Sequence, residues 1–217
     1  MSLFKTSNVK ITGLSSVYGS ENLSIDQMEC FKNDKDKITN LKSKIGLNKV
    51  FKAKSGITAF DLCLLAIKKI KDETNLIDEN VKTIIFVTQT PDYFLPSNAA
   101  LIHKYLKLDT SCACFDINQG CAGYVYGLWL SNIILNNSTK GSKILLLAGD
   151  TMTHALDSSD QTTMPIFGDA GTATVLENMG TDEQNLESYF DLNMDGQGSE
   201  SIIIKNGGFR EISKKKK

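Results

Sequence analysis

The apolar positions of this chain fall into short runs that alternate with helical patterns. Three runs, 83–88, 112–117 and 143–148, are rich in apolar residues and each predict a buried strand. Helical patterns lie between these runs, over about 98–106 and 121–135. Because strands that alternate with helices pair in parallel, the pattern predicts an α/β fold whose sheet is covered on both faces.

A further helix is predicted before the first of these strands, over 58–71. Thr58 and Asp61 have the spacing of a capping box at its start. The apolar residues that share one face of this helix are Phe60, Leu64, Ile67 and Ile70. The segment is therefore expected to be amphipathic.

The later part of the chain has a different pattern, with strands and no helix. A strand is predicted over 172–176, and two more over 187–194 and 201–204. The pair Asp195-Gly196 lies between the last two and is typical of a hairpin turn. We expect this hairpin to begin a second domain that is not completed.

Composition and charge exclude several classes of function. The formal net charge is −1, so no global field would draw the chain onto nucleic acid. The run Lys214–Lys217 is more typical of a solvated end. No stretch reaches about 18 consecutive apolar residues, and the N-terminus lacks the features of a signal peptide, so no membrane segment and a cytoplasmic location are expected. Neither glycine-rich phosphate-binding pattern, G-x-x-x-x-G-K-[ST] or G-x-G-x-x-G, occurs, so a nucleoside triphosphate or dinucleotide loop is not predicted.

The cysteines predict reduced thiols rather than a disulfide framework. The chain has five of them, an odd number. They are Cys30, Cys63, Cys112, Cys114 and Cys121. No C-x-x-C pair occurs and the only histidines are His103 and His154, so no metal site is predicted. His103 is interpreted as a partly buried helix residue, and His154 as a residue that could line a pocket at the end of a strand.

Cys121 differs from the other cysteines in its surroundings. A strand ends near Ile117, a tight turn follows, and a helix begins at or just after Cys121. The positive end of a helix favours thiolate over thiol, and thiolate is the better nucleophile. Gly120, Ala122 and Gly123 leave room for a substrate carbonyl. Turn chemistry alone leaves two interpretations open, a nucleophile or a small buried hydrophobe.

The helix after Cys121 carries apolar residues that share one face, and we expect this face to be buried. They are Val125, Leu128, Trp129, Asn132 and Ile133. The turn itself differs from the G-x-S-x-G elbow of hydrolases, because Gln119 stands where that elbow needs glycine. A cysteine hydrolase is therefore the less favoured interpretation.

Three segments together resemble the 3-oxoacyl-ACP synthase III family. Residues 87–99 (VTQTPDYFLPSNA) resemble its T-x-T-P-D-x-x-x-P-S strand and loop. Residues 116–127 (DINQGCAGYVYG) are similar to its D-x-x-x-x-C-[AS]-G nucleophile segment, and residues 166–176 (IFGDAGTATVL) to its F-G-D-G-A-G-A segment. Gly149-Asp150 also fits, and the order and spacing of the segments agree. The resemblance covers nearly the whole chain.

This resemblance implies a thiolase-like layered fold. Residues 1–180 would form a complete N-terminal βαβαβ half that carries the nucleophile, and 181–217 the incomplete start of the C-terminal half. Cys121 would take an acyl group from a thioester for decarboxylative condensation with malonyl-ACP. The acyl-binding residues implied are Leu95, Gly120, Phe167 and Gly168.

The resemblance also implies a catalytic histidine and asparagine from the C-terminal half, and neither can be matched in this chain. Because family members are substantially longer, it implies a truncated or incompletely represented protein, or a separate C-terminal partner chain. No bound cofactor is expected, since an acyl-CoA or acyl-carrier-protein thioester is the substrate. Asn40, Lys44 and Gln161 stand where members that use coenzyme A have a tryptophan and arginines, which favours an acyl-carrier-protein donor.

Two other functions stay open at this stage. The acyl group could pass to an alcohol, amine or thiol without decarboxylation. Alternatively, the chain could be a non-catalytic half that forms an interface with a longer relative. The resemblance implies a homodimer through the N-terminal half, with the loop at Phe94-Leu95-Pro96 reaching into the partner's pocket.

Overall fold

The structure, a computed structural model, divides the chain into two compact units. The residues it describes are 3–181, 186–205 and 207–210. The larger unit is Thr6–Ser188, and the smaller one combines Met1–Lys5 with Tyr189–Lys217. The division into halves at residue 180 stays a prediction, and the run Lys214–Lys217 lies outside the described residues. No helix in the described ranges is long and apolar enough to span a bilayer.

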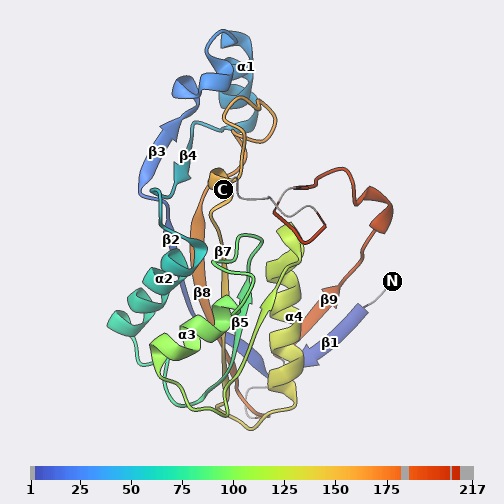
Figure 1. The fold of residues 1–217 in the computed structure, drawn as a ribbon. Helices are drawn as coiled ribbons and strands as arrows, with labels where there is room; N and C mark the ends of the chain where they lie inside the picture. Colours follow the sequence, from blue (N-terminus) through green and yellow to red (C-terminus); the bar gives the residue numbers. More distant parts are fainter. Residues whose placement is uncertain (1–2, 182–185, 206, 211–217) are drawn as a thin grey trace. The chain divides into compact units, whose positions relative to one another are not determined.

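A five-stranded mixed sheet forms the centre of the larger unit (Figure 1). Its strands, in spatial order, are β2 (Val9–Tyr18), β8 (Ala170–Asn178), β7 (Lys143–Asp150), β5 (Val81–Val87) and β6 (Ala113–Ile117). β5, β6 and β7 run parallel, as predicted, whereas β8 is antiparallel to both β7 and β2. The three parallel strands therefore end at one edge of the sheet.

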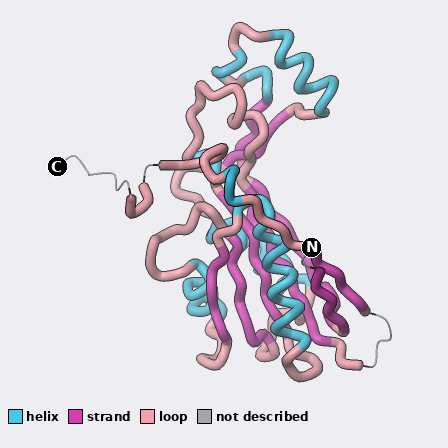
Figure 2. The backbone as a smooth tube through the Cα atoms, turned by 90° about the vertical axis from the view of Figure 1, so that its right-hand side faces the viewer, coloured by secondary structure: helices cyan, strands magenta, loops and turns pink. Residues whose placement is uncertain are grey.

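Three helices cover this sheet on its two faces (Figures 1 and 2). α2 (Ala59–Glu73) and α3 (Asn98–Leu106) share a buried apolar cluster on one face, and α4 (Gly123–Asn136) contributes to the cluster on the other. The capping box of Thr58 and Asp61 is present at the start of α2. All three helices and the α/β layering follow the predicted pattern.

Alternation along β5 separates the two cores. Ile84 and Phe86 pack in the cluster with α2 and α3, while Ile85 and Val87 pack in the cluster with α4. All four side chains are buried, because a strand in the middle of a covered sheet faces an apolar layer on each side. This is why its sequence is a continuous apolar run.

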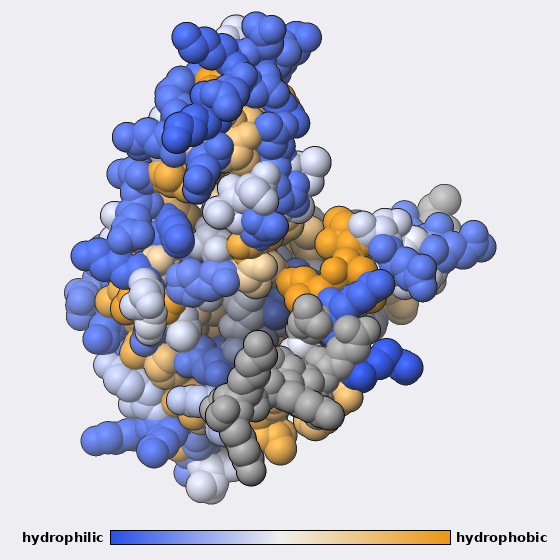
Figure 3. All heavy atoms as spheres, turned by 45° about the horizontal axis from the view of Figure 1, so that its top comes forward, coloured by the Kyte–Doolittle hydropathy of each residue, from blue (hydrophilic) through white to orange (hydrophobic). Residues whose placement is uncertain are grey.

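A small excursion follows β2 and was not predicted from the sequence. It holds the hairpin of β3 (Glu21–Ser24) and β4 (Lys49–Lys52), with α1 (Lys35–Asn40) between the two strands. Its own core contains Ile25, Met28, Phe31, Leu41 and Val50. Hydrophilic side chains cover most of its outer surface in Figure 3.

The predicted hairpin near the end of the chain is wrong. β9 (Glu187–Asp191) forms, but it pairs with β1 (Leu3–Ser7), and residues 201–204 form no strand. The carboxylate of Asp195 accepts the N–H of Gln197 at 2.9 Å, which starts a 3₁₀ turn in place of a two-residue hairpin turn. Local capping therefore outweighed the Asp-Gly turn pattern.

The predicted buried face of α4 is also wrong in part. Val125 and Ile133 are exposed, while Asn132 is buried. The residues buried on α4 are Gly123, Gly127, Ser131, Asn132 and Leu135. A Cβ added to Gly127 would lie 2.6 Å from Cδ1 of Leu146, so the helix packs on the sheet through its small residues. Apolar periodicity therefore identified the packing side of α4 only in part, through Leu128, which packs against the core, and the buried Asn132.

Candidate active site

Cys121 lies in the turn that connects β6 to α4. The turn is a short 3₁₀ helix, Gly120–Ala122, and α4 begins directly after it. Gly120 has a φ of 56°, a left-handed conformation that glycine adopts without strain. A Cβ added to Gly123 would lie 2.4 Å from Cγ1 of Val87 on β5. The small residues around Cys121 are therefore required by the turn and by close packing, and they leave the cysteine exposed.

Exposure separates Cys121 from the other four cysteines. Burial raises the pKa of the Cys63 and Cys112 thiols to about 12 and also raises the pKa of Cys30 and Cys114. None of these four is exposed, and all stay protonated thiols at neutral pH. Cys121 is therefore the cysteine that a substrate can reach, and its role as nucleophile stays a prediction.

The carboxylate of Asp150 holds the segment beside the cysteine turn. Its Oδ1 accepts the backbone N–H groups of Gln89 at 2.7 Å and Thr90 at 3.0 Å. It also accepts the hydroxyls of Thr88 and Thr90, both at 3.0 Å. A Cβ on Gly120 would lie 3.4 Å from Nε2 of Gln89, so this segment lies against the turn. The sequence pattern includes Asp150 but gives no indication of this role.

Replacing Asp150 with alanine should loosen the segment beside Cys121. The change removes one acceptor that serves four donors, and we expect it to lower the free energy of unfolding by about 2 kcal/mol. Acyl uptake by Cys121 should fall by about 10-fold, because the wall of the site is no longer fixed. Asp72→Ala, an exposed aspartate on α2, is the matched control. Denaturant unfolding and time-resolved mass measurement would detect both effects, and equal behaviour of the two variants would contradict this role.

Asp116, at the end of β6, connects two of the three motifs. Its carboxylate accepts the N–H of Asn98 at 2.7 Å and of Ala99 at 2.8 Å, which caps the start of α3. Burial raises its pKa, while these two hydrogen bonds act in the opposite direction. The same Asn98 accepts the N–H of Asp92 at 3.2 Å. The loop before α3 is thus attached to the strand that leads to Cys121.

Leu95 lies at the tip of this loop, away from the hydrogen bonds of Asp116 and Asn98 that hold the base of the loop. The residue is 86% exposed, and the peptide bond between Leu95 and Pro96 is cis. Tyr93 and Phe94 beside it are also exposed large side chains. The loop therefore presents an apolar tip to solvent, as a segment that reaches outward would.

The third motif is attached to the excursion by a buried carboxylate. Asp169 accepts the N–H of Ala53 at 2.8 Å, and both the N–H and the hydroxyl of Thr153, at 3.0 and 2.6 Å. Gly168 lies beside β4, where an added Cβ would be 3.3 Å from the carbonyl oxygen of Phe51. Asp169 thus has a structural role that the sequence analysis did not assign.

The predicted site residues are brought together only in part. Gly120 adjoins Cys121, but among the described residues no hydrogen bond links Leu95, Phe167 or Gly168 to that turn. The acyl-binding role of these residues stays a prediction. His154 is exposed, its Nε2 lies 3.2 Å from the carbonyl oxygen of Ala53, and it lines a separate hollow of about 570 Å³.

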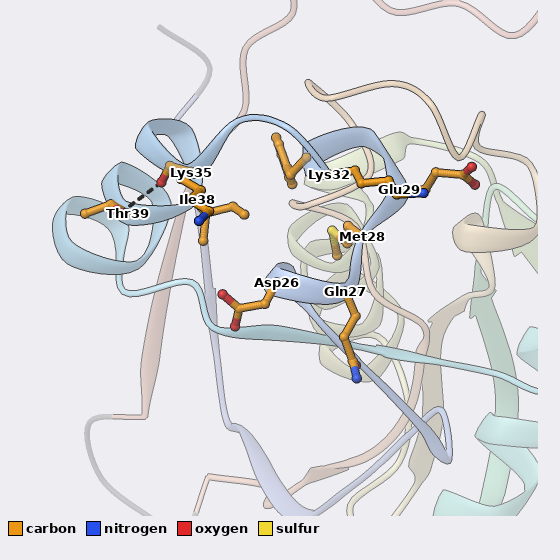
Figure 4. A pocket seen from close by; sticks show the side chains of 9 residues that line it. Asp26, Gln27, Met28, Glu29, Lys32, Lys35, Ile38 and Thr39 are labelled. Carbon is orange, nitrogen blue, oxygen red and sulfur yellow. Dashed lines mark hydrogen bonds between the residues drawn. The ribbon is translucent and has the colours of Figure 1, made fainter.

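Another hollow, of about 680 Å³, lies in the excursion (Figure 4). The side chains that line it include Asp26, Glu29, Lys32 and Lys35, so it carries both signs of charge. Asn40 and Lys44 are exposed nearby in sequence, on and just after α1. The hollow offers no tryptophan and no arginine for a nucleotide.

Gln161, which the resemblance aligns with an arginine of members that use coenzyme A, is occupied by internal contacts. Its Oε1 accepts a hydrogen bond from the ammonium group of Lys37 at 2.9 Å, and its Nε2 donates one to the carbonyl oxygen of Cys30 at 2.6 Å. The amide thus connects two segments of the protein. A neutral amide with both ends paired is a poor substitute for a free guanidinium.

Comparison with known proteins decides the family. The model of the 3-oxoacyl-[acyl-carrier-protein (ACP)] synthase III family matches residues 115–196, which include Cys121. A candidate 3-oxoacyl-[acyl-carrier-protein] synthase 3 of Campylobacter jejuni is 33% identical over 186 residues, which are 85% of this chain and 51% of that protein. The chain belongs to the 3-oxoacyl-ACP synthase III family.

Other members of the family agree with this assignment. The beta-ketoacyl-[acyl-carrier-protein] synthase III of Rickettsia canadensis is 30% identical over 92% of this chain and 61% of its own length. The crystal structure of a 3-oxoacyl-(acyl-carrier protein) synthase of Burkholderia xenovorans matches with a TM-score of 0.85 and 33% identity, over 95% of this chain and 58% of that one. The predicted thiolase-like fold is confirmed. The chain spans about half to three fifths of these relatives.

Proposed function

We propose that this chain is an acyltransferase that accepts an acyl group on Cys121. The observation that carries the proposal is the exposed cysteine in a turn of small residues, within the segment that the family model matches. The thiolate of Cys121 attacks the carbonyl carbon of an acyl thioester and forms a new C–S bond. The bond to the donor sulfur breaks, and the donor leaves as a thiol.

The fate proposed for the acyl group is condensation with malonyl-ACP. In that step malonyl-ACP loses carbon dioxide, and its carbanion attacks the carbonyl carbon of the acyl-cysteine. The bond to the sulfur of Cys121 breaks, the thiolate leaves, and a 3-oxoacyl product is formed on the carrier protein. The developing enolate needs hydrogen-bond donors aimed at its oxygen. His103 and His154 do not supply them, since their Nε2 atoms contact the carbonyl oxygens of Asp109 and Ala53. The part of the reaction assigned to residues 1–217 is therefore acyl transfer to Cys121.

We further propose an acyl carrier protein, rather than coenzyme A, as the acyl donor. Two features support this choice: the mixed charge of the hollow near α1, and the internal pairing of Gln161. Neither offers a tryptophan or a guanidinium for the nucleotide of coenzyme A.

Donor preference gives a direct test. With acyl-ACP and acyl-CoA carrying the same acyl chain, we expect acylation from acyl-ACP to be at least about 10-fold faster per unit concentration, which corresponds to about 1.4 kcal/mol. Gln161→Arg should narrow the difference, and Gln197→Arg, which changes an amide in the smaller unit, should not. Intact mass against time provides the rates. Faster acylation from acyl-CoA would contradict the donor assignment while leaving Cys121 as the acyl carrier.

Two alternative functions give different results in two further assays. Release of carbon dioxide from malonyl-ACP by the acylated protein supports condensation, and acyl transfer to an alcohol, amine or thiol without release supports the second function. A protein that gains no acyl mass from either donor, yet changes its elution volume with a longer relative, would be a non-catalytic interface partner. A homodimer, which we propose for the functional form, would elute at twice the mass of the chain.

A further inference from the structure

Three side chains with metal-binding atoms lie close together, and none of them belongs to the acyl-transfer site proposed at Cys121. Among the described residues, the potential ligand atoms of His103, Cys112 and Cys114 all lie within 4.8 Å of one another. His103 is on α3, Cys114 is on β6, and Cys112 directly precedes that strand. The cluster belongs to none of the three motifs of the family.

The topology explains why these residues meet. α3 connects the parallel strands β5 and β6, so it runs back along the sheet and its last turns lie beside the start of β6. Cys112 and Cys114 are two residues apart and both pack against the cluster that α3 shares. Both sulfurs therefore face the helix that carries His103. The sequence predicted no metal site, because it has no C-x-x-C pair and only two histidines; the fold nevertheless brings His103 beside Cys112 and Cys114.

The distances fit a small ion after minor side-chain movement. With Zn–S bonds of about 2.3 Å and Zn–N bonds of about 2.0 Å, ligand atoms of a tetrahedral site lie about 3.5–3.8 Å apart. Atoms within 4.8 Å of one another thus need to approach by at most about 1.0–1.3 Å. Rotamer adjustment of two cysteines and one histidine can supply this.

A fourth ligand is already in position. Nε2 of His103 lies 3.0 Å from the carbonyl oxygen of Asp109. Without a metal, this nitrogen must carry the proton that the carbonyl accepts. A cation between the two atoms would replace that proton, with the imidazole proton moving to Nδ1. With Zn–N at about 2.0 Å and Zn–O at about 2.0–2.2 Å, the two atoms of a tetrahedral site would lie about 3.4 Å apart, so the carbonyl oxygen would need to move outward by about 0.4 Å.

Charge and burial select the kind of metal. Cys112 is buried, and Cys114 and His103 are half-buried, so a bare thiolate pair would be costly here. A divalent ion removes that cost, since it displaces two thiol protons and leaves a neutral site. Thiolate and imidazole ligands together suit zinc, whereas magnesium and calcium prefer oxygen.

We propose that His103, Cys112 and Cys114 bind one zinc ion, with the carbonyl oxygen of Asp109 as the fourth ligand. The site fastens the end of α3 to the start of β6. The opposite ends of the same two elements are already joined by Asp116, which caps α3. The ion is structural, because all four positions are taken by the protein and no open position is left for a substrate.

Cobalt(II) is the first probe, because its tetrahedral thiolate complexes absorb visibly and zinc complexes do not. The full chain would be titrated with Co²⁺ under a phosphine reductant, in the Cys121→Ala variant, so that the exposed thiol cannot bind the ion. We expect one equivalent to produce thiolate-to-cobalt charge-transfer bands and tetrahedral d–d bands, and one equivalent of Zn²⁺ to remove them. No bands, or bands of an octahedral complex, would overturn the proposal.

Ligand variants identify the atoms that bind. Cys112→Ser and Cys114→Ser should each weaken the charge-transfer band, and His103→Gln should lose the tetrahedral pattern. Cys30→Ser, which changes a half-buried cysteine outside the cluster, should keep the full spectrum. Bands that persist in Cys114→Ser, or that are lost in Cys30→Ser, would place the ion elsewhere and overturn the site.

A measurement without substitutions at the cluster guards against variants that fail to fold. Zn²⁺ should slow alkylation of Cys112 and Cys114 relative to Cys30, as read from the masses of their peptides. Equal rates with and without Zn²⁺ would contradict the site. A disulfide between Cys112 and Cys114 that persists under reductant would contradict it as well. If the results expected for the zinc site are not obtained, the proposed acyl transfer to Cys121 still stands, because Cys121 is not part of the cluster.

Discussion

Cys121→Ala is expected to abolish acyl uptake completely. Alanine keeps the small size that the turn requires but has no atom that can form a thioester. Incubation with acyl-ACP should add one acyl mass to the unmodified chain and none to the variant. The other cysteines cannot compensate, because none of them is exposed and burial raises the pKa of each thiol.

Cys30→Ala is the matched control for this prediction. Cys30 is half-buried in the excursion and has no role in the proposed chemistry. This variant should take up one acyl group at a rate close to that of the unmodified chain. If Cys121→Ala still gained acyl mass, or if Cys30→Ala lost it, the nucleophile would be a different residue. Circular dichroism of both variants would show that the fold is kept.

Gly123→Ala is expected to have the second-largest effect, on both stability and acyl uptake. The added methyl would lie 2.4 Å from Cγ1 of Val87, a β-branched side chain in the buried layer under α4. Relief of this overlap requires α4 to move away from β5, at a cost of about 1–3 kcal/mol. The turn that carries Cys121 moves with the helix, and a displacement of about 1 Å can cost about 100-fold in rate.

Gly196→Ala is the matched control, since it makes the same chemical change where an added Cβ meets nothing within 4 Å. We expect its unfolding midpoint and its acylation rate to stay close to those of the unmodified chain. Chemical denaturation would measure the first quantity and time-resolved intact mass the second. A Gly123→Ala variant as stable and as reactive as Gly196→Ala would contradict the packing argument.

The elements around the nucleophile could be predicted because each has a strong local signal. β5 and β7 are continuous apolar runs, α2 begins at a capping box, and α3 begins after Ser97, whose side chain accepts the N–H of Ala100. The tight turn at Cys121 could be predicted from Gly120 and Gly123, which flank that cysteine. These signals depend on residues close in sequence, so they can be recognised without knowledge of the fold.

Other features depend on contacts between distant residues and could not be predicted. β2 has no continuous apolar run and is placed by its pairing with β8, a strand about 160 positions later in the chain. The β3–β4 hairpin depends on a core of its own. The four hydrogen bonds of Asp150 connect residues about 60 positions apart. The packing side of α4 is set by Gly123 and Gly127, whose lack of side chains gives no hydrophobic signal.

The central claim is that Cys121 carries the acyl group, and locating that group tests the claim most directly. The full chain would be incubated with acyl-ACP, digested at a pH that preserves thioesters, and mapped by mass spectrometry. We predict the acyl mass on the peptide that contains Cys121, with removal by hydroxylamine as expected for a thioester. Acyl mass on any other peptide, or on none when the protein is folded, would contradict the account.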